Sequence, residues 1–405
     1  MRLWSTVLAA GISLVLACPA QAQKNYGPGV TDTEIKLGQT VAYSGPGSAY
    51  SMVGRMSVAY FKMLNETQGG INGRKLNLLS LDDAYTPPKT VEATRKLVES
   101  DNVLAMVNSM GTAMQVSVQK YLNTKQVPQL LFYASSPALH DAKATPWTVP
   151  WSFAYNVEGG IYGKHILQTK PNAKIAVLWQ NDDLGRDYVT GIKAGLGDKA
   201  ASMVVSDASY ELADPTIDSQ VVKLKSSGAD LLFSASTPKF AAQAIKKVAD
   251  LGWKPVHIVD INATSVGAVL VPAGLENSKG LISTNYGKDP ADPQWKDDAG
   301  MKRYFAFMEK YYPEGDKNSN FNTYGYGNAQ LMAEVLKRCG DNLTRANVMK
   351  QATSLSGYSN DLGLPGMSYS TTPTDYRLNK QLQMQKFNGE RWELFGPIIE
   401  DDANG

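Results

Sequence analysis

The chain has 405 residues, of which 43% are hydrophobic and 19% are charged. This hydrophobic share excludes a disordered or fibrous chain, and the length predicts two or three folded units at roughly 150 residues per domain. Lys and Arg number 40 against 38 Asp and Glu, which gives a net charge of +2, and no run of four or more basic residues occurs. These charges argue against nucleic acid or an anionic membrane as a partner.

The first residues have the pattern of an export signal. One arginine precedes the apolar stretch 3–17, and Ala20-Gln21-Ala22 offers small residues to a signal peptidase. We therefore expect a signal peptide over 1–22, and a free periplasmic protein after cleavage. The alternative is a lipid anchor at Cys18, because Val15-Leu16-Ala17-Cys18 partly resembles the box that precedes a lipidated cysteine.

Cysteine usage agrees with a fold that is stabilised by its cores. The chain has two cysteines, and cleavage after the signal would leave only Cys339. No intramolecular disulfide is therefore expected in the mature protein.

From residue 33 to residue 260, strand and helix patterns alternate. The predicted strands are 33–38, 76–81, 103–107, 129–132, 174–179, 202–206, 230–234 and 256–260. The predicted helices are 51–66, 87–100, 112–123, 185–197, 215–227 and 238–251. Such alternation predicts right-handed βαβ units on parallel sheets. A Pro/Trp-rich break at 146–153 divides the pattern into two series.

The last region of the chain, from residue 286 onward, is less regular. Three helices and a terminal hairpin are predicted there: 295–312, 321–339, 344–353, and 381–387 with 392–395. Asn388-Gly389 supplies the turn of the hairpin. We expect this tail to complete one or both sheets.

Catalytic and metal-binding motifs are missing from the sequence. The nearest approach to a phosphate loop, Glu158 to His165, lacks the first glycine and the Ser or Thr after the lysine, and is interpreted as a helix start. The three histidines are far apart, and the acid pairs Asp82-Asp83 and Asp182-Asp183 are more typical of loop acids or helix caps than of general bases. Cys339 has no activating surroundings. We therefore expect no enzyme, no cofactor and no metal.

Polar residues follow several predicted strands at their carboxyl ends, where open α/β sheets bind ligands. These segments are Ser44-Gly45-Pro46, Asn108–Thr112 and Ala134–Pro137. The start of the helix at Thr112 and the hydroxyl of Ser135 would together suit a carboxylate. The alternative is that both hydroxyls only cap helices.

Several segments together resemble periplasmic leucine/isoleucine/valine-binding proteins. The resemblance is carried, in order, by Ile35-Lys36-Leu37-Gly38, Ser44-Gly45-Pro46, Gly69-Gly70-Ile71-Asn72-Gly73-Arg74-Lys75-Leu76 and Asp82-Asp83. It continues through Val127-Pro128, Pro171–Val177 and Gly228-Ala229-Asp230, and so covers essentially the whole mature chain.

The resemblance implies an α/β architecture, the two-lobe type I periplasmic-binding or Venus-flytrap fold. Parallel sheets flanked by helices would form the lobes, and three strands would form the hinge. The implied N-terminal lobe is 26–152 plus 286–375, and the implied C-terminal lobe is 153–285 plus 376–405. The family delivers solutes to the membrane permease subunits of ABC importers and performs no chemistry, so we expect a monomer that binds a small carboxylate.

The resemblance also implies ligand-contact positions. The hydroxyls that grip the carboxylate would be those of Thr112 and Ser135. The other implied contacts are Tyr50, Met110, Tyr133, Thr237, Asp260 and Tyr324. Two of these positions depart from the family pattern: Thr237 replaces a tyrosine, and Ile261, beside Asp260, replaces the acid that holds the ligand ammonium. The disulfide common in the first lobe of relatives is also absent.

Several functions remain open at this stage. The favoured one is the capture of a branched-chain or other hydrophobic amino acid for import. Because of the departures at Thr237 and Ile261, aromatic or aliphatic carboxylic acids without an amine are the alternative ligands. The same fold also serves in ligand-sensing receptor modules, and a secreted hydrolase would need a nucleophile and base that the sequence does not reveal.

Overall fold

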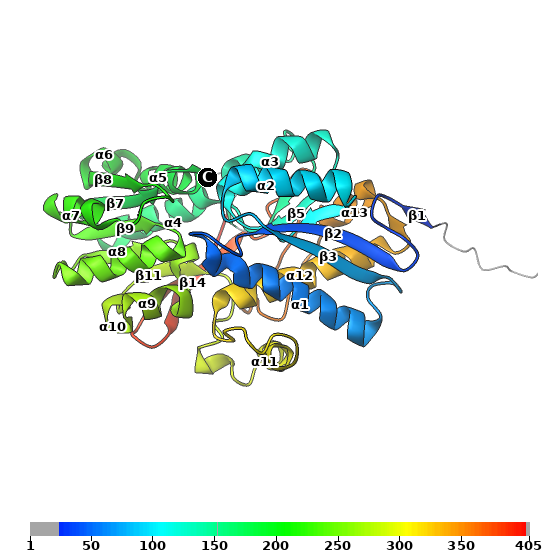
Figure 1. The fold of residues 1–405 in the computed structure, drawn as a ribbon. Helices are drawn as coiled ribbons and strands as arrows, with labels where there is room; N and C mark the ends of the chain where they lie inside the picture. Colours follow the sequence, from blue (N-terminus) through cyan, green and yellow to red (C-terminus); the bar gives the residue numbers. More distant parts are fainter. Residues whose placement is uncertain (1–23, 152, 402–405) are drawn as a thin grey trace, which may run out of the picture.

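A computed structural model describes residues 24–151 and 153–401. The predicted signal peptide and Cys18 lie outside these residues. The described chain forms two lobes that lie side by side, each built around a sheet with helices packed against it (Figure 1). Over these residues, no helix is both long enough and apolar enough to cross a membrane.

The first lobe contains a parallel sheet of five strands in the order β3-β2-β4-β5-β6. Its strands are β2 (Glu34–Val41), β3 (Lys75–Asp82), β4 (Ala105–Val107), β5 (Gln129–Phe132) and β6 (Thr148–Pro150). The first four confirm predicted strands. The fifth, β6, lies inside the predicted break at 146–153, because three residues that end in proline carry no strand alternation.

The helices of the first lobe come from both ends of the described chain. They are α1 (Ser51–Gln68), α2 (Pro87–Arg95), α3 (Thr112–Thr124), α11 (Ala299–Tyr311), α12 (Asn320–Cys339) and α13 (Arg345–Ala352). All confirm predicted helices, and α2 continues as a π-helical turn to Ser100. Helix α12 packs along α1, and the short strand β12 (Asn342–Leu343) pairs with β1 (Asn25–Tyr26), so the late helices belong to this lobe.

The second lobe contains a sheet of seven strands in the order β14-β13-β11-β10-β9-β7-β8. Its strands are β7 (Ile175–Gln180), β8 (Val204–Tyr210), β9 (Leu231–Ala235), β10 (Val256–Val259), β11 (Ile282–Asn285), β13 (Gln381–Phe387) and β14 (Trp392–Glu400). The first five are parallel, and the predicted terminal hairpin adds β13 antiparallel to β11 and β14 antiparallel to β13. The tail therefore completes this sheet.

Two strands of the second lobe differ from prediction. The strand predicted at 202–206 is displaced, because Ala200–Met203 form the short helix α6 and β8 then runs on to Tyr210. Strand β11 was not predicted, because its four residues, Ile282–Asn285, are mostly polar. Their burial in the sheet offsets this weak strand pattern.

Helices cover the second sheet on both faces. They are α4 (Tyr155–Thr169), α5 (Asp183–Leu196), α7 (Asp218–Ser226), α8 (Pro238–Asp250) and the short α9 (Val271–Ala273) and α10 (Leu275–Ser278). Helix α4 confirms the interpretation of residues 158–165 as part of a helix start. In both lobes the central strands are buried along their whole length, as parallel strands between helix layers must be.

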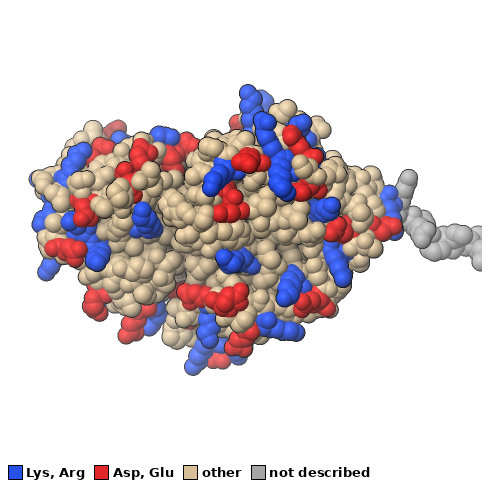
Figure 2. Space-filling model, viewed as in Figure 1, with Lys and Arg blue, Asp and Glu red and all other residues tan. Residues whose placement is uncertain are grey.

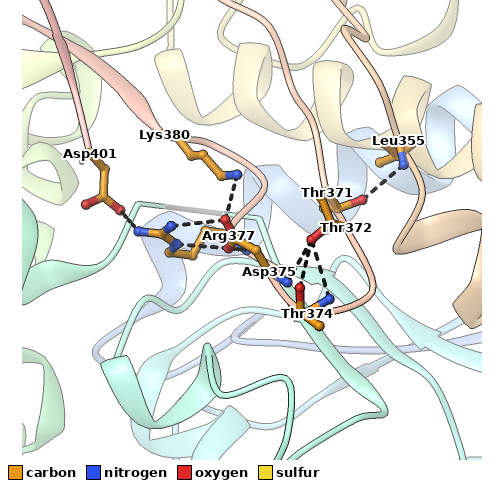
Figure 3. Close-up of polar contacts among 8 residues, drawn as sticks. All are labelled: Leu355, Thr371, Thr372, Thr374, Asp375, Arg377, Lys380 and Asp401. Atoms are coloured by element: carbon orange, nitrogen blue, oxygen red, sulfur yellow. Dashed lines mark hydrogen bonds and ion pairs between the residues drawn. The ribbon is translucent and has the colours of Figure 1, made fainter. Parts of the chain in front are cut away.

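The chain passes between the lobes three times. The passages lie between β6 and α4, between β11 and α11, and between α13 and β13. In the third, the Arg377 guanidinium donates to both oxygens of Asp375 at 2.9 and 3.0 Å, and Lys380 pairs with the same carboxylate at 2.7 Å (Figure 3). A further bond of 2.7 Å from Arg377 to Asp401 ties this segment to the end of β14.

The charged surface has no dominant sign. On the face shown in Figure 2, basic and acidic side chains are interspersed around a broad uncharged area. This distribution agrees with the near-zero net charge of the sequence.

Candidate functional site

A cavity lies between the lobes, and residues of both lobes line it. Nine of the lining residues are apolar or aromatic, and the polar ones are Ser135, Glu158 and Asn262. The apolar and aromatic ones are Val53, Met110, Tyr133, Phe153, Tyr155, Ile261, Tyr286, Phe321 and Tyr324. The cavity therefore suits a mostly apolar ligand with few polar groups.

The first-lobe wall of the cavity presents unused hydrogen-bond donors. Helix α3 begins after Gly111, whose φ is 102° and which offers no side chain to the N–H groups of the first turn. A β-carbon at Gly111 would overlap Met114 and Tyr85, so this close turn requires glycine. The Ser135 side chain follows β5, lines the cavity and is buried with no hydrogen-bond partner among the described residues. Of these groups only Ser135 lines the cavity; a hydroxyl together with a helix start that no side chain caps is the kind of donor set that a carboxylate needs.

Thr112 lies at the edge of this arrangement. It is the first residue of α3, and it is buried. Its hydroxyl is 3.0 Å from the Tyr155 hydroxyl, which belongs to a residue of the cavity wall. Thr112 itself is not among the residues that line the cavity, and its hydroxyl contacts the wall only through Tyr155.

Tyrosines form one side of the cavity. Tyr324 stacks on Tyr286, with ring centroids 5.0 Å apart, and Tyr133 donates a hydrogen bond from its hydroxyl to the Tyr324 carbonyl. Tyr50 is buried behind Phe321, with ring centroids 5.3 Å apart, and does not itself line the cavity. The bridge between Met110 and Tyr133 extends the pairing of β4 and β5 and holds both residues at the wall.

The Asp260 carboxylate is engaged by its own loop and by the loop that follows β9. Its Oδ2 atom accepts from the Ser236 N–H at 2.7 Å, and Oδ1 accepts from the Asn262 N–H at 2.9 Å and from the Asn262 side-chain amide at 2.7 Å. Burial, followed by the nearby charge of Glu158, raises the pKa of Asp260 to about 7. Asn262, and not Asp260, lines the cavity.

Thr237 lies outside the cavity lining and has partners of its own. Its hydroxyl donates to the Gln180 Oε1 atom at 2.9 Å, and its N–H donates to the Tyr210 hydroxyl at 3.2 Å. The residue is buried at the start of α8. The structure thus brings Met110, Tyr133, Ser135 and Tyr324 together at the cavity. It places Tyr50, Thr112, Thr237 and Asp260 behind its surface.

Glu158 is the acid that sequence reasoning missed. Its Oε1 atom accepts from the Tyr162 hydroxyl at 2.5 Å, from the Thr284 hydroxyl at 2.8 Å and from the Ile261 N–H at 3.1 Å. The Oε2 atom accepts from the Tyr188 hydroxyl at 2.5 Å. Burial raises the pKa of Glu158 although these hydrogen bonds oppose the shift, and all four of these hydrogen-bond donors are neutral groups.

The glycines near Glu158 explain its position. Helix α4 packs closely on α5, and β-carbons at Gly159 or Gly163 would come within 2.8 or 2.6 Å of α5 carbonyl oxygens. Close packing lets the Tyr188 side chain of α5 reach Glu158. The run Glu158-Gly159-Gly160 was therefore a packing signal rather than a phosphate-loop signal.

Cys339 has the surroundings of a structural cysteine. The thiol is buried and donates to the Val335 carbonyl at 3.3 Å, and burial raises its pKa to about 12. Among the described residues, no group of three His, Cys, Asp or Glu side chains is placed to hold a metal ion.

The fold and this inter-lobe cavity define a two-lobed solute-binding protein of the type I periplasmic class. The profile of the periplasmic binding protein family matches residues 34–391, so the chain belongs to that family. Its similarities within the family place it in the leucine/isoleucine/valine-binding type.

Individual relatives are distant but cover most of the chain. The Leu/Ile/Val-binding protein homolog 7 of Brucella abortus (strain 2308) is 22% identical, over 91% of this chain and 91% of its own. A branched-chain amino acid ABC transporter protein from Thermus thermophilus with bound valine superposes with a TM-score of 0.79 at 17% identity, covering 92% of this chain and 98% of its own. A fatty acid ABC transporter substrate-binding protein from Thermomonospora curvata superposes with a TM-score of 0.77 at 21% identity, covering 93% and 95%. At these identities the superpositions establish the fold alone.

Proposed function

We propose that this protein captures a branched-chain or other hydrophobic amino acid in the periplasm and delivers it to the permease of an ABC importer. The observation that carries the proposal is that two of the three polar residues of a mostly apolar cavity, Ser135 and Glu158, lie on opposite walls. Ser135 offers an unused donor on the first-lobe wall, and Glu158 offers a carboxylate on the second-lobe wall. A ligand with one carboxylate, one ammonium and an apolar side chain would complement both walls.

The carboxylate of the ligand would lie against the start of α3. The Ser135 hydroxyl and the free N–H groups of the first turn would donate to it, and the positive end of the helix would favour its charge. Thr112 would act through Tyr155, by holding the orientation of that hydroxyl.

The ammonium of the ligand would face Glu158. The family acid is replaced by Ile261 in this sequence, yet the Ile261 N–H donates to the Glu158 carboxylate at 3.1 Å. In this proposal Glu158 of α4 takes the role of the acid that Ile261 replaces. A buried carboxylate without a cationic partner is unfavourable, and a ligand ammonium would supply the missing charge.

A second ligand class is favoured by one observation. Six of the cavity-lining residues are aromatic, which suits aromatic or aliphatic carboxylic acids that lack an amine. For such ligands Glu158 would be protonated, in keeping with its raised pKa. We rank amino acids first because four groups donate hydrogen bonds to Glu158, and these favour its charged form.

The wider role follows from the family, whose members are solute-binding proteins. We propose that this chain is likewise no enzyme, that it is a monomer, and that the signal peptide 1–22 directs it to the periplasm. We further propose that the closing bodies are 26–152 with 286–375 and 153–285 with 376–405. The three passages of the chain between the lobes support this division.

Calorimetry with leucine and with 4-methylpentanoate, the same molecule without its amine, tests the proposal. We expect leucine to bind more tightly in the wild type, and Glu158→Gln to weaken leucine while leaving 4-methylpentanoate unchanged or improved. Glu66→Gln, on the exposed surface of α1, is the matched control. Tight binding of 4-methylpentanoate with no binding of leucine would instead support the amine-free acids. Turnover of a bound compound would contradict the non-enzyme role.

A further inference from the structure

A second cavity lies beside the first, and Tyr324 lines both. We call it the polar chamber; the residues that matter for its chemistry are Thr264, Lys288, Asp289, Asn320, Tyr324 and Gln385. Asn320 begins α12 on the first-lobe side, whereas Thr264 follows β10 in the second lobe. The chamber therefore lies at the junction of the lobes.

Three residues of the polar chamber carry a buried oxygen without a donor. These atoms are Asp289 Oδ2, Asn320 Oδ1 and Gln385 Oε1, and none has a hydrogen-bond partner in the part of the chain that the structure describes. Gln385 is almost completely buried, with 1% of its surface exposed. Buried acceptors are rarely left without a donor, and three around one cavity indicate that an outside group supplies donors there.

Three of the side chains that line the polar chamber make hydrogen bonds or ion pairs with other groups. The Asn320 amide donates to the Thr264 hydroxyl at 2.9 Å, and the Gln385 amide donates to the Thr284 carbonyl at 2.9 Å. The Lys288 ammonium pairs with Asp298 at 2.8 Å and donates to the Asp361 carbonyl at 3.1 Å. Rotating the Gln385 amide would point its oxygen at the Thr284 carbonyl, so rotation does not give the Gln385 oxygen a donor.

The number and kind of these acceptors indicate their ligand. A primary ammonium group has three N–H donors, and the chamber has one carboxylate oxygen and two amide oxygens that lack donors. Calcium takes six to eight oxygen ligands, and magnesium requires an octahedron of six. We propose that the polar chamber binds a primary ammonium group, from either a small free amine or the terminal amine of an extended ligand.

Occupation of the chamber would favour closure of the lobes. An ammonium that contacts Asn320 and Asp289 from one body and Gln385 from the other would bridge the same junction as the Asn320–Thr264 hydrogen bond. Asp289 would supply the negative charge. This proposal is independent of which ligand the first cavity takes.

Thermal unfolding of the full mature protein without other ligand tests the chamber. Methylammonium chloride should raise the midpoint more than sodium chloride or tetramethylammonium chloride at the same ionic strength, because only methylammonium offers three N–H donors. Asp289→Asn and Gln385→Leu should each weaken the methylammonium effect by about tenfold in the concentration required. Asp297→Asn, whose side chain is exposed and lies outside the chamber, should not.

Lysine and norleucine separate the two sources of the amine, because they differ by the terminal ammonium. Tighter binding of lysine that disappears in Asp289→Asn would assign the chamber to an extended ligand; equal binding of both, with methylammonium still stabilising, would assign it to a free amine. An equal shift with all three salts, or the same methylammonium response in both chamber variants as in wild type, would overturn the proposal. If Asp289→Asn does not fold, Gln385→Leu decides alone.

Discussion

The two walls of the ligand cavity are built in different ways. On the first-lobe side, the polar groups follow directly from the ends of strands: Ser135, which lines the cavity, comes after β5, and Thr112, which lies behind the wall, comes after β4. On the second-lobe wall, the end of β10 supplies only Ile261 and Asn262 to the cavity, and the carboxylate comes from Glu158 in the first turn of α4.

This difference shows which site residues can be predicted from the neighbouring sequence alone. A polar residue just after a parallel strand is placed by the sheet itself, so its position follows from the strand pattern. Glu158 reaches the cavity because α4 packs tightly on α5. Its position depends on contacts between residues far apart in sequence: Tyr188 is 30 positions away and Ile261 is 103 positions away. A motif search at the strand end therefore finds Asp260, which is engaged by its own loop and by the loop that follows β9.

Replacement of Glu158 should give the largest effect. Glu158→Ala would leave the Tyr162, Tyr188 and Thr284 hydroxyls and the Ile261 N–H without their acceptor. We expect the free energy of unfolding to fall by about 3 kcal/mol or more, since each unsatisfied buried group costs about 1–3 kcal/mol. Urea denaturation measures it. Glu158→Gln keeps an acceptor and should lose less; an equal loss in both variants would mean that the charge, and not the hydrogen bonds, holds this wall together.

Replacement of Ser135 should have the next largest effect. We expect it to lower ligand affinity rather than the free energy of unfolding. A hydrogen bond to a charged group contributes about 1.5–3 kcal/mol, so Ser135→Ala should weaken the binding of the carboxylate ligand by about tenfold or more. Thr112→Ala should weaken it less, because Thr112 acts through Tyr155. Calorimetry on both variants, with urea denaturation to check folding, compares them. Unchanged ligand affinity in the variant that carries both substitutions would mean that the two hydroxyls have only structural roles.

The fold was largely predictable from the sequence. Strands β5 and β9 are short, mostly apolar runs, as parallel strands buried on both faces are, and β2 and β3 alternate polar with apolar residues for part of their length. Strand β11 is not predictable from its sequence, because its pairing with β10 and β13 stabilises a polar segment that has little strand preference of its own.

The site was predictable only in part. Ser135, Met110 and Tyr133 follow from strand ends, whereas Glu158 and Asn320 depend on how helices pack across the molecule. Glycines in a helix indicate that another helix packs closely against it. Their spacing alone does not predict which side chain that close packing places at the site. The acid opposite the ligand therefore required the structure.

Asp260 gives a pH test of the second-lobe wall. Its pKa is raised to about 7 in the folded protein, so between pH 8 and pH 6 the folded state takes up a proton that the unfolded state does not. The free energy of unfolding should therefore rise as the pH falls, by about 1 kcal/mol over this range. Asp260→Asn should lack this part of the pH dependence, and the difference between the two denaturation series measures it. Identical pH profiles would show that Asp260 keeps its charge in the fold.

The smallest effect on stability should come from the third passage of the chain between the lobes, the hinge segment around Arg377. This segment lies outside both walls of the cavity. Arg377 binds both oxygens of Asp375 and also reaches Asp401, an arrangement that one lysine ammonium does not reproduce (Figure 3). Although burial opposes it, hydrogen bonds from Arg377 and Lys380 hold the pKa of Asp375 below its usual range. Because the pair is partly exposed, Arg377→Lys should lower the free energy of unfolding by only about 0.5–1 kcal/mol. Arg338→Lys, whose arginine makes a single bond to Glu334 on α12, is the matched control and should change almost nothing. Equal free energies of unfolding for the two variants would mean that the double contact does not stabilise the third passage. A lower free energy of unfolding in Arg377→Lys, with unchanged ligand affinity, would show that the hinge stabilises the fold independently of the walls that bind the ligand.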